Sequence, residues 1–195
     1  MTTASLFRLG GSAALLAAVL FGAGNITYFL SRQQPTTLGY WVGIIGNAFF
    51  VLALCAVFAR QAQRGGVLGL IGFVLLVWSL LGDIGVQAVS LGVAAGVFTN
   101  AQLAQVPGYA LVDTVHFWMF VVGQIALGIS IYRARVLPQY AGALLVVLGL
   151  IQPLTGPLAF TRPIYAIGFF VAWSWLGWSL LMAKNAVSAQ PVSAT

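Results

Sequence analysis

The chain consists of long apolar runs separated by short segments that contain arginine. Charged residues make up 5% of it, against about 25% in a typical soluble domain, and 61% of its residues are hydrophobic. Runs of about 20 apolar residues have the length that a helix needs to cross a bilayer. A spanning segment must pair its backbone groups internally, and a helix does so. The sequence therefore predicts an all-α membrane protein.

Six runs have the length or composition of a membrane span. The first exceeds the apolar core of a signal peptide, so it counts as a span. The uncharged segment 97–111 is the longest predicted loop, with a short interfacial helix as one option. We predict one six-helix domain over 1–184 and a disordered cytoplasmic tail over 185–195. The predicted spans are residues 9–30, 39–59, 66–96, 113–131, 140–158 and 163–183.

The positions of the basic residues predict the orientation of the chain. Six spans place both termini on one side, and lysine and arginine are concentrated on the cytoplasmic side of membrane proteins. Both termini are therefore predicted to be cytoplasmic. The basic residues are scattered and form no run, which argues against nucleic acid as a partner. The predicted cytoplasmic set is Arg8, Arg60, Arg64, Arg133, Arg135 and Lys184, and the outer set is Arg32 and Arg162.

Asp83, one of two acidic residues, lies inside the third apolar run. A charge at membrane depth costs at least about 2.5–3.5 kcal/mol and usually faces a protein interior or a wet cavity. Counting about 1.5 Å per residue from the cytoplasmic arginines puts Asn25, Asp83, His116 and Gln152 about 25–29 Å from the inner interface. Asn47 lies somewhat deeper. The count predicts a polar layer in the outer third of the membrane.

Helix periodicity groups these polar residues further. Asp83 and Gln87 are four positions apart, and Asp113 and His116 are three apart, so each pair shares a helix face. We predict that these faces surround a hydrated pocket open to the outside. The candidate catalytic residues are Asp83, Asp113 and His116, and the candidate polar ligand-binding residues are Asn25, Asn47, Gln87 and Gln152.

Three aromatic residues, Tyr165, Phe169 and Trp173, form a stripe at intervals of four on the sixth predicted span. The stripe is either a wall for a flat apolar ligand or ordinary packing. The polar residues also have a structural alternative, because Asn and Gln form hydrogen bonds between transmembrane helices, Gln124 among them. Asp113 could be a helix N-cap, and His116 an ordinary hydrogen-bonded histidine.

The residue supply argues against several chemistries. The chain has one histidine, one lysine, Lys184, at a predicted helix end, and one cysteine, Cys55, within an apolar run. These are too few ligands for a bis-histidine haem or a typical zinc site, and no disulfide can form within the chain. No phosphate-binding loop or nucleophile elbow is present. We predict no cofactor and no metal.

Two segments carry a family resemblance. FRLGGSAALLAAVLFGAGN at 7–25 and YRARVLPQYAGALLVVLGL at 132–150 resemble the opening and the fourth-to-fifth helix junction of a broad family of six-helix bacterial membrane proteins, classed as a domain of unknown function. The resemblance implies a location in the bacterial cytoplasmic membrane. It implies no activity and transfers no functional residue.

Three functions fit these observations. The first is binding of a lipophilic molecule, such as an isoprenoid, a sterol-like compound or a quinone, in a pocket open to the outer leaflet. The second is a small membrane isomerase or cyclase in which Asp83 acts as acid or base, with Asp113 and His116 as its partners. The third is a proton-coupled carrier for a small solute. The partners expected are the bilayer and the lipophilic molecule, and the oligomeric state stays open.

Overall fold

The computed structural model describes residues 3–30, 36–158 and 160–183, and the described residues form helices and connections without a strand. Four helices, α1, α2, α4 and α6, are long and apolar enough to cross a membrane. The all-α prediction is thereby confirmed. The predicted tail 185–195, Arg32 and Lys184 lie outside the described residues. The helices are α1 Thr3–Leu30, α2 Thr37–Ala94, α3 Asn100–Ala104, α4 Tyr109–Ala134, α5 Gln139–Ile151, the 3₁₀ helix η1 Gln152–Leu154, and α6 Thr161–Leu181.

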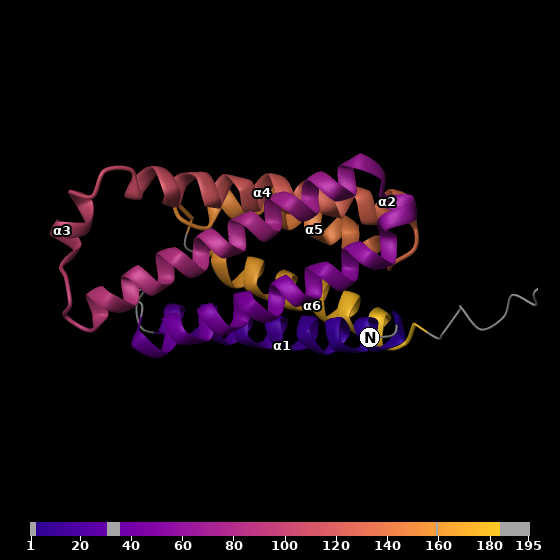
Figure 1. Ribbon diagram of the computed structural model, residues 1–195, viewed down its shortest axis with the longest axis horizontal. Helices are drawn as coiled ribbons and strands as arrows, with labels where there is room; N and C mark the ends of the chain where they lie inside the picture. Colours follow the sequence, from indigo (N-terminus) through magenta and orange to yellow (C-terminus); the bar gives the residue numbers. More distant parts are fainter. Residues whose placement is uncertain (1–2, 31–35, 159, 184–195) are drawn as a thin grey trace, which may run out of the picture.

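Helix α2 contains both the second and the third predicted span. Its 58 residues are helical except at Gly66, where φ is 58° and ψ is −163°. Glycine adopts this backbone conformation readily because it has no Cβ. Two arms, 37–65 and 67–94, run from this break toward the same end of the molecule (Figure 1). The first arm continues six residues past the predicted end at Ala59. Arg60 and Arg64 can stay within the helix because long arginine side chains reach water with their charged ends.

The helices pack side by side in a bundle. Helix α1 packs on α2 and α6, α2 packs on α4, and α4 packs on α5. The chain start, the Gly66 break and the end of α6 lie at one end of the molecule, and α3 lies at the other (Figure 1). Helix α3 falls within the predicted loop 97–111 and begins with a capping box formed by Thr99 and Gln102.

Helix α5 is shorter than the fifth predicted span, which reached Leu158. It has 13 residues and ends at Ile151, where the chain tightens into η1. Pro153 has no N–H and cannot continue the helical hydrogen bonding. The Thr155 hydroxyl donates to the Gln152 carbonyl at 2.8 Å and stabilises the turn that follows. The early end of α5 leaves Gln152 and Thr155 beside a cavity described below.

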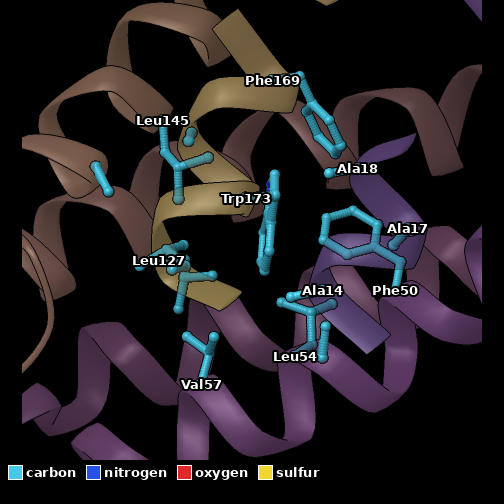
Figure 2. Packing of buried hydrophobic residues seen from close by; sticks show 14 of the residues in the cluster. Ala14, Ala17, Ala18, Phe50, Leu54, Val57, Leu127, Leu145, Phe169 and Trp173 are labelled. Atoms are coloured by element: carbon cyan, nitrogen blue, oxygen red, sulfur yellow. The ribbon is translucent and has the colours of Figure 1, made fainter. Parts of the chain in front are cut away.

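Trp173 lies at the centre of the apolar core and is 1% exposed. The rings of Phe50 and Trp173 meet edge to face with centroids 4.2 Å apart, and Leu54 and Leu127 lie close by (Figure 2). Alanines of α1 complete this packing, because their small side chains let neighbouring helices approach closely. These are Ala13, Ala14, Ala17 and Ala18.

Candidate functional site

Two adjoining cavities lie toward the end of the molecule that carries α3. The larger has a volume of about 600 Å³ and is lined mainly by α1 and the first arm of α2. The smaller, of about 270 Å³, reaches Ser79 on the second arm of α2 and Thr155 after η1. We refer to the two together as the polar cavity. The residues that line both are Phe21, Asn25, Asn47, Phe50, Asp83 and Arg162.

Asp83 lies within reach of three polar side chains of the polar cavity. Its Oδ2 accepts hydrogen bonds from Asn47 Nδ2 at 2.6 Å and from Gln87 Nε2 at 2.5 Å. Asn47 belongs to the first arm of α2, whereas Asp83 and Gln87 belong to the second, so the carboxylate joins the two arms. The Asp83 side chain is 35% exposed, which leaves it accessible to a molecule in the cavity.

Two glycines make room for the partners of Asp83. A Cβ added at Gly43 would lie 2.0 Å from Gln87 Oε1, and a Cβ added at Gly82 would lie 2.9 Å from His116 Cβ. Both distances are shorter than real carbon contacts permit. The absence of a side chain at these two positions therefore allows Gln87 and His116 to reach their observed places.

His116 approaches the other oxygen of Asp83, with its Nε2 3.6 Å from Asp83 Oδ1. Its Nδ1 lies 3.1 Å from the Val112 carbonyl oxygen. A carbonyl can only accept, so this contact assigns a proton to Nδ1. Nε2 then faces a carboxylate oxygen at a distance that suits an ion pair and is longer than a hydrogen bond. The two side chains form an ion pair when the imidazole is protonated.

Asp113 completes this group at the rim of the cavity. Its Oδ1 lies 3.9 Å from His116 Nδ1, and its side chain is 58% exposed. The backbone of His116 is also anchored, because its carbonyl accepts a hydrogen bond of 2.7 Å from the Ser79 hydroxyl. The structure thus brings the three candidate catalytic residues, Asp83, Asp113 and His116, into one cluster.

A second polar group, buried more deeply, links three helices. The Tyr165 hydroxyl on α6 lies 3.1 Å from both Gln124 Oε1 on α4 and Gln152 Oε1 at the end of α5. Gln124 Nε2 donates to the Leu145 carbonyl at 3.1 Å, which fixes the orientation of this amide. Gln124 is 1% exposed and does not line the polar cavity, so its role is to form hydrogen bonds between helices. Tyr165 and Gln152 line the smaller cavity.

The remaining predicted site residues lie at different depths. Asn25 lines both cavities, and its Nδ2 donates to the Phe21 carbonyl of its own helix at 2.9 Å. Phe169 lines the larger cavity and stacks on Phe21 with ring centroids 4.0 Å apart. Trp173 lines neither cavity and belongs to the apolar core. The aromatic stripe therefore divides into cavity lining toward α3 and packing below.

Arg162 and Thr36 line the larger cavity but are not among the predicted site residues. In the sequence, Arg162 is a charge that flanks the sixth predicted span, and its assignment to the outer set of basic residues gives no signal of a cavity beside it. Thr36 has a detectable role, since it precedes α2 and its hydroxyl accepts from the Gly39 N–H at 3.0 Å. That signal predicts a helix cap and says nothing about a ligand.

Metal-binding capacity in this region is small. Among the residues that the structure describes, no three His, Cys, Asp or Glu side chains are grouped closely enough to hold a metal ion. Cys55 lies apart from the polar cavity, exposed on the first arm of α2. The polar groups that line the cavity are carboxylates, a histidine, amides, hydroxyls and the guanidinium of Arg162.

Fold and site together define a helical protein with four helices long and apolar enough to cross a membrane and a polar cavity that contains a carboxylate–histidine pair. Comparison of the chain with protein-family models, with curated proteins and with solved structures finds no match. The resemblance of residues 7–25 and 132–150 to the six-helix bacterial family therefore stays a sequence-based expectation.

Proposed function

We propose that this chain is a multi-pass membrane protein that binds a lipophilic small molecule in the polar cavity. The observation that carries this proposal is the Asp83 carboxylate, which lies in a cavity wall that also contains Phe21, Phe50 and Phe169. A mostly apolar pocket with a few fixed polar groups is the usual form of a small-molecule site. An isoprenoid, a sterol-like compound or a quinone combines a polar end with an apolar body in this way.

Mass spectrometry of the purified protein tests the proposal. The protein is extracted in mild detergent, its retained lipophilic molecules are released with organic solvent, and their composition is compared with that of the membranes from which it came. We expect one class of lipophilic molecule to be enriched over bulk lipid. An extract with the same lipid composition as the source membranes would contradict the proposal.

Gly43→Ala is expected to weaken ligand retention without unfolding the protein. The new methyl group would occupy the position of the Gln87 amide and remove its hydrogen bond to Asp83. A hydrogen bond to a charged group contributes about 1.5–3 kcal/mol, so we expect an affinity loss of about tenfold or more. The control is Gly85→Ala on the second arm of α2, two positions before Gln87, where a Cβ meets nothing within 4 Å. Equal retention by both variants would contradict the positioning of Gln87.

Acid–base catalysis on the bound molecule is the second candidate, favoured by the 3.6 Å separation of Asp83 Oδ1 and His116 Nε2. A proton carried by one of these two groups in a partly dry site can be delivered to an alkene or an epoxide, which gives an isomerase or a cyclase. Incubation of the retained molecule with fresh protein separates the two candidates. A product of changed structure identifies an enzyme, and an unchanged molecule identifies a binding protein.

We also propose six spans with both termini in the cytoplasm, in the bacterial cytoplasmic membrane. Support comes from the two arms of α2, and from the placement of the chain start, the Gly66 break and the end of α6 at one end of the molecule (Figure 1). In this arrangement α5 and η1 together form the fifth span.

Reporter fusions test this orientation. An alkaline phosphatase fused after Pro107 is expected to be active, because that segment would lie outside the cytoplasmic membrane. A fluorescent protein fused at Thr195 is expected to fluoresce in the cytoplasm. An inactive phosphatase after Pro107 together with a non-fluorescent fusion at Thr195 would show that the chain has the opposite orientation.

A further inference from the structure

A third cavity lies at the opposite end of the molecule, near the Gly66 break. It has a volume of about 370 Å³ and is lined by Arg60, Gln63, Arg64 and Val136. We refer to it as the basic cavity. Three of its lining residues come from the end of the first arm of α2, and Val136 comes from the connection between α4 and α5.

The basic cavity concentrates hydrogen-bond donors on one helix face. Arg60, Gln63 and Arg64 are spaced at i, i+3 and i+4, so their side chains are neighbours on the helix. Each guanidinium carries five N–H donors, and the Gln63 amide adds two more. The chain has two acidic residues, Asp83 and Asp113, and both line the polar cavity at the other end. The basic cavity therefore has no carboxylate in its lining.

Two like charges four positions apart destabilise a helix unless a counter-charge lies between them. Arg60 is nevertheless held in place, since its guanidinium lies 5.4 Å from the centroid of the Phe7 ring, a cation–π contact with α1. Arg64 is exposed. Two guanidiniums on one helix face can bind a single tetrahedral anion together, with the bidentate geometry that arginine favours for phosphate.

Exposed apolar and aromatic side chains lie close in sequence to the lining of the basic cavity, together with the exposed Arg133 and Arg135. Val67, three residues beyond Arg64, is 73% exposed, and Tyr132 and Tyr140, which flank the connection that holds Val136, are 47% and 63% exposed. Exposed valine suits acyl chains, and tyrosine is enriched at the level of lipid headgroups. Basic pockets between transmembrane helices bind anionic headgroups.

We propose that the basic cavity binds the phosphate group of an anionic phospholipid. The phosphodiester would lie between the Arg60 and Arg64 guanidiniums, and the acyl chains would lie along the exposed apolar side chains beside it. This site is independent of the polar cavity, so it stands whether or not a lipophilic molecule binds there.

Lipid titration of paired double variants tests the site. Wild type, Arg60→Gln/Arg64→Gln and Arg133→Gln/Arg135→Gln are purified in detergent and titrated with phosphatidylglycerol or phosphatidylcholine, and bound lipid is counted by native mass spectrometry. Both variants lose the same charge, but Arg133 and Arg135 do not line the cavity. We expect a roughly 30-fold loss of phosphatidylglycerol affinity in the first variant and near-wild-type affinity in the second. Phosphatidylcholine is expected to bind all three proteins alike.

The losses of affinity in the two double variants separate a specific site from general charge attraction. Equal losses in both double variants would show general charge attraction, and no loss in either would show an empty cavity; either result overturns the proposal. Inorganic phosphate that displaces the lipid would place a free anion at the site and overturn the lipid assignment.

Thermal unfolding of each variant shows whether the variant is still folded. If the first double variant unfolds, Arg64→Gln alone, which leaves the Phe7 contact intact, is expected to lower the affinity several-fold, and wild-type affinity there overturns the site.

Discussion

Trp173→Ala is expected to lower the free energy of unfolding by about 3–5 kcal/mol, as replacements of large buried aromatic residues by alanine do. Trp173 is 1% exposed and lies edge to face against Phe50, at the junction of α6 with the first arm of α2. Its removal would leave a cavity where helices depend on close packing for their association. Unfolding in mixed detergent and sodium dodecyl sulfate, followed by far-ultraviolet circular dichroism, measures the loss.

Trp178→Ala on the same helix is the matched control. The Trp178 side chain is 57% exposed on the outer surface of the bundle. The same chemical change there should cost less than about 1 kcal/mol, because few protein contacts are removed. If the two variants lost equal stability, or Trp178→Ala lost more, the packing of α6 described above would be incorrect.

The amino-acid sequence predicts the helices well because the constraint behind them is simple. A span needs about 20 apolar residues and leaves its charges at the ends, and both features are visible in one dimension. The connections are less predictable. The two arms of α2 meet in a single break at Gly66, whereas the sequence predicts two spans, 39–59 and 66–96, with a connection between them. Pro153 indicates an interruption in the fifth span, but the exact end at Ile151 depends on tertiary contacts such as that of Tyr165 with Gln152.

Distance along a helix is also enough to predict much of the site. Counting from the arginines groups Asn25, Asp83, His116 and Gln152 in one layer, and the structure brings all four to the wall of the smaller cavity. The interval of four between Asp83 and Gln87 predicts a shared face, and the structure adds a direct hydrogen bond.

The rest of the site depends on pairs of helices, which one sequence does not specify. The contact of Gly43 with Gln87 requires the two arms of α2 to approach, and no periodicity reports that approach. Periodicity shows that Trp173 shares a helix face with Phe169. It does not show how far the cavity extends along that face, so it cannot separate the cavity-lining Phe169 from the buried Trp173. Arg60 and Arg64 read as topology signals in one dimension and form a cavity wall only in three.

Asp83→Asn is expected to lower the affinity for the lipophilic molecule by about tenfold to a hundredfold. The substitution removes the charge, so Asn47 and Gln87 lose the carboxylate that orders them, and His116 loses its ion-pair partner. A polar end placed against this cluster would then meet amides in altered orientations. Because the neutral amide has nearly the same shape, the fold is expected to persist, as circular dichroism would show.

A comparison of three proteins shows whether Asp83 organises a ligand site. Wild type, Asp83→Asn and Asp113→Asn are purified in parallel, and the moles of retained lipophilic molecule per mole of protein are measured by mass spectrometry. Asp113 undergoes the same chemical change at the exposed rim, where its side chain is 58% exposed. We predict that Asp83→Asn is largely empty while Asp113→Asn keeps most of its ligand. Retention by Asp83→Asn equal to that of wild type would contradict the account.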